Sequence, residues 1–213
     1  FYYRQMIPMS VLNLAKVAPL NMHGSLLPKY RGRVPINWAV LHGETETGAT
    51  LHVMAEKPDA GDIVAQRAVP IGPDETAGEV FANVTASAAE TLKGVLPQLL
   101  KGNVPRSPNN LAEGSYFGGR KPEDGRIHWE QTAQQVYNLI RAVAPPYPGA
   151  FTDVATAQGT ERITINAARR MEGTFDRAPG IYRTGSKVIG ICGDKMAVEL
   201  TEFTPTTFDP TTL

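Results

Sequence analysis

The chain changes character near its middle, and this change limits it to a two-domain organisation. Residues 102–120 are rich in Gly, Pro, Asn and Ser, a composition typical of a connecting segment. Strand-like and helical runs alternate before this segment, whereas short β-rich runs dominate after it. We therefore predict an α/β domain over residues 1–121, including a linker at about 102–121, and a small β-barrel or sandwich over 122–213.

Periodicity and capping patterns place the individual elements. Thr76 and Glu79 form a capping-box pattern, and the apolar residues behind them follow helical spacing: Val80, Phe81, Val84, Ala88 and Leu92. Thr132 and Gln135 begin another helix with the same pattern. The other expected helices cover 10–15, 35–41 and 95–100, and the expected strands cover 18–23, 47–54, 63–71, 162–167, 180–182, 187–192 and 196–200.

Composition excludes several classes of protein. The 213 residues are 42% hydrophobic, enough for a core, and 21 Lys and Arg balance 21 Asp and Glu. A neutral chain has no general attraction for nucleic acid or an anionic membrane, and no apolar run approaches the roughly 20 residues of a membrane span. The single cysteine, Cys192, excludes a disulfide within the chain, fits a cytoplasmic protein and is expected in the core.

The residues Asn21 and His23 are the first candidates for chemistry. On a strand, residues two apart point to the same face, so an amide and an imidazole would project side by side. An imidazole transfers protons near neutral pH, and loss of one amide donor to an oxyanion typically costs about 3–4 kcal/mol of barrier. The pair therefore suits acyl transfer, although a structural histidine beside a turn asparagine would give the same triplet.

A carboxylate is needed to orient the imidazole and raise its pKa, and the residues leave two candidates, Asp59 and Asp62. The other histidines, His42, His52 and His128, have no metal-ligand spacing and are expected to be structural or exposed. Ser25 lacks an evident base, so a turn or cap role is expected for it.

The stretch NMHGSLLPKYRG resembles the signature of the folate-dependent formyltransferases. The segments ETETGATLHVM, DAGDIVAQ, GRIHWEQ and RAVAPPYPGAF resemble later parts of the same family. The resemblance implies the second half of a doubly wound, Rossmann-like formyltransferase domain followed by an OB-like β-barrel domain. It also implies that about 80 further residues precede Phe1 and supply the first strands of the sheet.

The resemblance assigns roles to particular residues. It makes His23 the catalytic acid and base, Asn21 the stabiliser of the transition state, and Asp59, rather than Asp62, the group that raises the pKa of His23. It implies 10-formyltetrahydrofolate as the formyl donor, with no metal. The positions that resemble contacts to this donor are Gln5, Met6, Ile7, Arg33, Ala55, Glu56, Lys57 and Pro58.

Within the family, residues 29–52 most resemble the UDP-4-amino-4-deoxy-L-arabinose formyltransferases. This implies a cytoplasmic enzyme that formylates a UDP-amino-sugar for lipid A modification and polymyxin resistance. Its expected partners are the sugar nucleotide and the folate, with a possible fused or partner dehydrogenase/decarboxylase domain. Neither nucleic acid binding nor membrane insertion is expected.

Two alternatives remain. Methionyl-tRNA formyltransferase also carries a C-terminal β-barrel, but residues 123–213 hold nine Lys and Arg against eleven Asp and Glu. A tRNA-binding barrel is expected to be basic, because phosphate contacts dominate its affinity. The second alternative is a non-catalytic ligand-binding module, against which the presence of Asn21, His23 and Asp59 argues.

Overall fold

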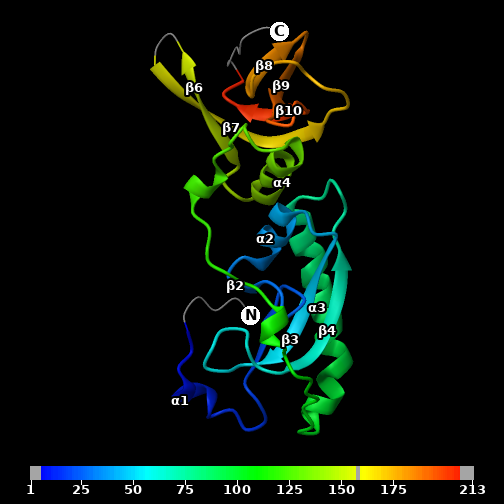
Figure 1. Cartoon of the computed structure of the whole chain (residues 1–213). Helices are drawn as coiled ribbons and strands as arrows, with labels where there is room; N and C mark the ends of the chain where they lie inside the picture. The colour runs from blue at the N-terminus through cyan, green and yellow to red at the C-terminus, as the bar shows by residue number, and fades with distance from the viewer. Residues whose placement is uncertain (1–5, 157–158, 207–213) are drawn as a thin grey trace. The chain divides into compact units, whose positions relative to one another are not determined.

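Three strands in the N-terminal half form an antiparallel sheet in the order β1-β3-β4 (Figure 1). They are β1 (Leu20–His23), β3 (Glu46–Val53) and β4 (Ile63–Pro70) in a computed structural model that describes residues 6–156 and 159–206. The expected α/β content is confirmed. Because these strands pair antiparallel, the described residues do not contain the parallel, doubly wound part of the expected sheet, which stays a prediction.

The helices of this half are α1 (Met9–Leu12), α2 (Pro35–His42) and α3 (Ala77–Leu100), and α3 runs alongside β3 and β4 (Figure 1). Pro35 begins α2, as predicted, because proline lacks only an N–H that the first helical turn does not use. The prediction of a separate helical piece over 95–100 is wrong, since α3 continues through Pro97. Phe81 is 38% exposed and lies off the buried face of the helix.

The segment after α3 is paired to the rest of the N-terminal half. After the 3₁₀ turn η1 (Leu111–Glu113), β5 (Tyr116–Phe117) pairs in parallel with β2 (Arg31–Gly32). Ser107 forms an antiparallel bridge with Ile63 at the start of β4. Backbone hydrogen bonds therefore fix the predicted linker to two other segments of the chain, and its role as a linker between domains stays a prediction.

The C-terminal half contains a curled, antiparallel half-barrel in the order β6-β7-β10-β9-β8 (Figure 1). The short turn η2 (Pro122–Gly125) and α4 (Ala133–Val143) precede it, and Thr132 and Gln135 form the predicted capping box. The strands are β6 (Ala150–Thr156), β7 (Gly159–Arg170), β8 (Gly180–Thr184), β9 (Lys187–Ile191) and β10 (Ala197–Thr204). Strand β6 was not among the expected strands, and the OB-like assignment stays a prediction.

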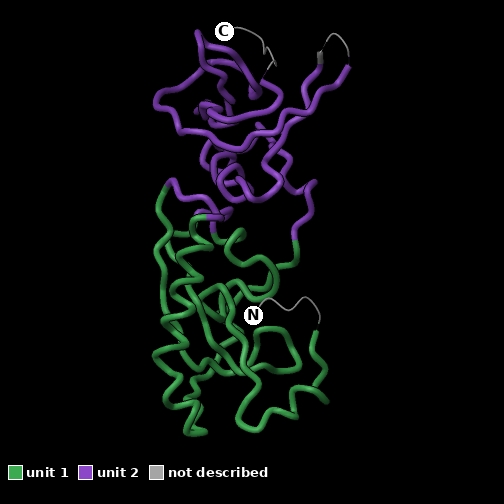
Figure 2. The backbone as a smooth tube through the Cα atoms, turned by 180° about the vertical axis from the view of Figure 1, so that it is seen from behind, with its two compact units in different colours: residues 1–39, 44–73, 79–119 green, residues 40–43, 74–78, 120–213 purple. Residues whose placement is uncertain are grey.

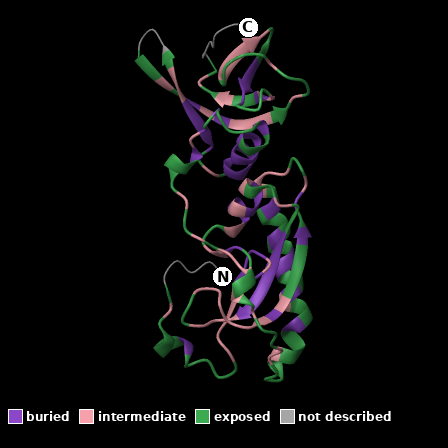
Figure 3. Ribbon diagram, viewed as in Figure 1, coloured by how far each residue is buried: buried purple, intermediate pink, exposed green. Residues whose placement is uncertain are grey.

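One face of α4 and the sheet form the core of this half, as the buried residues in Figure 3 show. Val136 and Ile140 on α4 pack with Ile163 and Ile165 on β7. Cys192 is buried in the same cluster, as expected. The described part of the chain has no helix that combines the length and the apolar character needed to cross a membrane.

The chain divides into two compact units that do not follow the sequence boundary alone (Figure 2). Unit 1 contains the chain up to Ala39, Glu44–Pro73 and Glu79–Gly119. Unit 2 contains the chain from Arg120 onward together with two short segments, Val40–Gly43 and Asp74–Gly78. The end of α2 and the start of α3 thus belong to the C-terminal unit.

The close approach of Gly190 to Trp129 generates a stability prediction. A Cβ added at Gly190 would lie 2.0 Å from the ring of Trp129, whose Nε1–H donates to Thr152 Oγ1. Gly190→Ala should therefore lower the free energy of unfolding of unit 2 by about 2–3 kcal/mol or more, measured by urea denaturation. As a control, Gly94→Ala fills open space in α3 and should raise stability by up to about 1 kcal/mol. Equal effects of the two changes would contradict this packing.

Candidate active site

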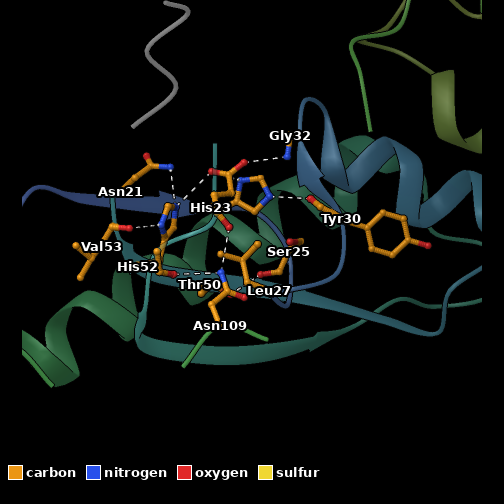
Figure 4. Close-up of polar contacts among 12 residues, drawn as sticks. Asn21, His23, Ser25, Leu27, Tyr30, Gly32, Thr50, His52, Val53 and Asn109 are labelled. Carbon is orange, nitrogen blue, oxygen red and sulfur yellow. Dashed lines mark hydrogen bonds and ion pairs between the residues drawn. The ribbon is translucent and has the colours of Figure 1, made fainter. Parts of the chain in front are cut away.

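The end of strand β1 presents Asn21 and His23 on one face, next to strand β3 (Figure 4). The antiparallel register places Asn21 opposite His52 and His23 opposite Thr50. The predicted side-by-side projection of the amide and the imidazole therefore holds. His23 is buried, so its ring lies in a largely dry environment.

The carboxylate of Asp59 reaches this face from the loop between β3 and β4. Asp59 Oδ1 lies 3.6 Å from His23 Nδ1 and 3.3 Å from His52 Nε2. Asp59 Oδ2 accepts a hydrogen bond from the backbone N–H of Gly32 at 2.8 Å. The backbone φ of Asp59 is +51°, a left-handed conformation that is uncommon for residues other than glycine. Three segments of chain thus hold one carboxylate beside the imidazole.

Asp62, the second carboxylate candidate, points elsewhere. Its side chain is 47% exposed and lies 3.9 Å from the guanidinium of Arg106. An exposed pair of this kind contributes little to stability. The geometry therefore joins Asp59, and not Asp62, to His23.

The hydrogen bonds of His23 define its tautomer. Nε2 lies 2.8 Å from the backbone carbonyl oxygen of Tyr30, which can only accept, so Nε2 carries a hydrogen. In the neutral ring Nδ1 is then the basic nitrogen, and it faces Asp59. A proton taken up at Nδ1 would point towards that carboxylate.

Burial lowers the pKa of His23 below its ordinary value of 6.5, although the charge of Asp59 and the hydrogen bond to Tyr30 act to raise it. Asp59 raises this pKa, as predicted, but desolvation by burial is the larger effect, so the net shift is downward. His23 is therefore mostly neutral at pH 7. In that form the ring acts as a base.

Burial would raise the pKa of Asp59, but contacts with three neighbours lower it below its ordinary value. These are the close contact with His52 Nε2, the charge of His23 and the backbone N–H of Gly32. The carboxylate is thus ionised near neutral pH and can stabilise an imidazolium at His23.

His52 is the residue of this cluster that sequence reasoning missed. Its side chain is only 2% exposed, and its Nδ1–H donates to the carbonyl oxygen of Val53 at 2.9 Å. Its Nε2 lies 3.3 Å from Asn21 Nδ2, so one nitrogen contacts both the amide and Asp59. Only the pairing of β1 with β3, which joins residues far apart in the chain, could have revealed this position.

The loop after His23 is held by buried polar contacts (Figure 4). Ser25 Oγ donates to the carbonyl oxygen of Lys29, which agrees with the expected turn role. Thr50 Oγ1 donates to the carbonyl oxygen of Ser25, and Gln66 Nε2 donates to Thr50 Oγ1. These contacts fix the turn that carries the carbonyl of Tyr30.

None of the described residues expected to contact a folate belongs to the cluster of Asn21, His23, His52 and Asp59. Gln5 falls outside the described residues, and Met6 is 64% exposed. Arg33, Glu56 and Lys57 are exposed, whereas Ile7, Ala55 and Pro58 are partly buried. Residues 55–58 lead directly into Asp59, and Arg33 follows Gly32.

The arrangement supplies an ionised carboxylate, a neutral imidazole and an amide donor within one face. Such a set can remove a proton from a nucleophile and donate a hydrogen bond to a developing oxyanion. Among the described residues, no group of three or more His, Cys, Asp or Glu is arranged to hold a metal ion.

Both halves of the chain match models of one protein family. Residues 1–96 match the formyl transferase model, and residues 120–210 match the model of the formyl transferase C-terminal domain.

Solved structures show the same fold. HypX from Aquifex aeolicus, in complex with tetrahydrofolic acid, has 24% identity and a TM-score of 0.70, over 95% of this chain and 34% of that chain. An N-formyltransferase from Helicobacter canadensis, in complex with folinic acid and dTDP-3-aminofucose, has 21% identity and a TM-score of 0.69. The match covers 85% of this chain and 65% of that chain. A 4-N formyltransferase from Francisella tularensis has 26% identity and a TM-score of 0.67, and the match covers 77% of this chain and 66% of that chain.

The chain thus spans about a third of the HypX chain and just under two thirds of the two other chains. Since the two family models together cover most of the 213 residues and lie on either side of the segment 97–119, the chain belongs to the formyltransferase family.

Proposed function

We propose that this protein transfers a formyl group from 10-formyltetrahydrofolate to the amino group of a UDP-amino-sugar, UDP-4-amino-4-deoxy-L-arabinose. The observation that carries the proposal is the meeting of His23, Asn21 and Asp59 at the end of β1. Similarity to structures described as N-formyltransferases, including the Helicobacter canadensis structure in complex with dTDP-3-aminofucose, supports the class of acceptor.

The residues of this face fit a folate co-substrate. The face offers an uncharged amide at Asn21, a neutral imidazole at His23 and the loop 55–58 beside Asp59. When bound, 10-formyltetrahydrofolate supplies the formyl carbon that the amine attacks. The chain's own residues then transfer the protons and stabilise the negative charge on the formyl oxygen.

His23 is the base of the proposed reaction. The new bond joins the amino nitrogen to the formyl carbon, the bond from that carbon to the folate nitrogen breaks, and the amine loses a proton. Nδ1 of His23 accepts this proton, directly or through a water, and the resulting imidazolium faces Asp59 Oδ1. The same proton can then return to the departing folate nitrogen, so that charge balances.

Asn21 stabilises the oxygen. One N–H of its amide faces His52, and the other donates to the formyl oxygen as negative charge develops there. Because His52 contacts this amide, it limits the rotation of the Asn21 side chain. The site thereby holds the hydrogen-bond donor of Asn21 in place before the reaction begins.

The resemblance to the UDP-4-amino-4-deoxy-L-arabinose formyltransferases also bears on where the protein acts and in which process. We infer a cytoplasmic enzyme of lipid A modification and polymyxin resistance, with a fused or partner dehydrogenase/decarboxylase domain. A tRNA acceptor is disfavoured because residues 123–213 carry two more acidic than basic side chains.

A product-mass assay tests the acceptor. The full-length protein, given 10-formyltetrahydrofolate, should add the mass of one formyl group to UDP-4-amino-4-deoxy-L-arabinose and leave charged initiator tRNA unchanged. Formylation of the tRNA alone would replace the proposed acceptor. Turnover with neither amine would favour a non-catalytic binding module.

Replacement of His23 tests the base. His23→Ala should lower kcat by about 10²–10⁴-fold while KM for either substrate changes little, because the ring acts in the transition state. The matched control is His128→Ala, which removes an exposed imidazole in unit 2 and should leave both constants unchanged. Full activity of His23→Ala would remove this residue from the mechanism.

The pH dependence follows from the lowered pKa of His23. Because the neutral ring is the base, kcat/KM should fall as the pH drops through a value below 6.5. Asp59→Asn removes a charge that raises this pKa, so the acidic limb should move to lower pH while the maximal rate falls. A limb that moves to higher pH in Asp59→Asn would contradict the assignment.

A further inference from the structure

The loop that carries Asp59 is held by a residue 50 positions further along the chain, Asn109 (Figure 4). Asn109 Nδ2 donates to the carbonyl oxygen of Asp59 at 3.0 Å and to the carbonyl oxygen of Gly61 at 3.1 Å. A carbonyl can only accept, so the NH₂ group of the amide must face the loop. Both hydrogens of this group are thus used to bind one short piece of backbone.

The oxygen atom of the same amide, Asn109 Oδ1, shows which part of the side chain makes the contacts. Asn109 Oδ1 is buried and has no hydrogen-bond partner among residues 6–156 and 159–206. A buried polar atom without a partner is costly, typically about 1–3 kcal/mol. The hydrogen bonds of the Asn109 side chain therefore all come from the two N–H groups on Nδ2.

The loop needs such a restraint because its conformation is strained. Asp59 has a φ of +51°, which costs of the order of 1–3 kcal/mol for a residue of this kind. Gly61 passes so close to β3 that an added Cβ would lie 2.0 Å from the carbonyl oxygen of Val53. A strained loop pressed against a strand persists only where neighbouring groups fix it.

The segment that carries Asn109 is itself anchored. Ser107 N–H donates to the carbonyl oxygen of Ile63 at 2.8 Å, and Ile63 N–H donates to that of Ser107 at 2.9 Å. Further along, the hydroxyl of Ser115 accepts the backbone N–H of Tyr30, whose carbonyl oxygen binds His23. One segment, residues 107–115, thus contacts the backbone on both sides of the imidazole.

We propose that Asn109 is a positioning residue for the proposed formyl transfer, which acts by holding the backbone of Asp59 and Gly61 so that the carboxylate of Asp59 faces His23. This inference rests on the proposed function for its kinetic consequence. Its structural consequence, the closeness of Asp59 to His23, can be measured without any substrate.

Two neighbouring asparagines provide a matched test. Asn109→Leu keeps the approximate shape of the side chain but removes both donors, and Asn110→Leu makes the same change at an exposed position. In the full-length protein, Asn109→Leu should lower kcat about ten- to a hundredfold with KM changed less than about threefold, because a displacement of about 1 Å costs this much. Asn110→Leu should match the wild type.

A double-mutant cycle separates positioning from general stability. If Asn109 acts through the carboxylate, Asn109→Leu should have little further effect on kcat in an Asp59→Asn background. A loss of the same size in both backgrounds would overturn the proposal. Thermal melts of each variant show whether the protein folds, and Asn109→Ala replaces Asn109→Leu in every arm if the latter does not.

Proton NMR titration of His23 provides the readout that is independent of activity. Loss of the nearby carboxylate should lower the titration midpoint of His23 in Asn109→Leu and leave it unchanged in Asn110→Leu. An unchanged midpoint in Asn109→Leu would overturn the inference even if formyl transfer is confirmed. Absence of formyl transfer in the wild type, with the midpoint shifted as expected, would instead reject the proposed function alone.

Discussion

The carboxylate of Asp59 is the group on which the candidate site depends, because separate segments of the chain converge on it. Gly32 donates to one oxygen, and the imidazoles of His23 and His52 lie beside the other. Burial and charge act against each other here. Desolvation lowers the pKa of His23, whereas the contacts of Asp59 keep the carboxylate ionised. The ring is consequently neutral at rest and has a counter-charge ready when it takes up a proton.

Backbone strain accompanies this convergence. Tyr30, Asp59 and Val34 all have positive φ values, of +55°, +51° and +47°, and Val34 is β-branched, for which this conformation is a genuine outlier. Such strain persists only where surrounding contacts over-determine the backbone. The two strained residues nearest the imidazole each have such a contact, from Ser115 to Tyr30 and from Asn109 to Asp59. The connecting segment after α3 therefore serves the site as well as joining two domains.

The sequence predicted what depends on local pattern and missed what depends on distant pairing. The two-residue period placed Asn21 and His23 on one face, and the capping box placed the start of α4 at Ala133. His52 was missed because it joins Asn21 only through the register of β1 with β3. The residues alone left Asp59 and Asp62 open, since a loop of this length has no period. In the structure Asp59, with a φ of +51°, lies beside His23, whereas Asp62 lies beside Arg106.

Polar contacts between residues far apart in the sequence also determine which segments belong to unit 2. Arg141 on α4 is only 6% exposed, and its guanidinium donates to the carbonyl oxygens of Val40 and Glu75 and to Asn138 Oδ1. A buried guanidinium left without these acceptors would be strongly destabilising. This explains why the short segments Val40–Gly43 and Asp74–Gly78 belong to unit 2, although both lie within the part of the chain that matches the N-terminal family model. The C-terminal unit thus depends on residues that a division by sequence alone would assign to its neighbour.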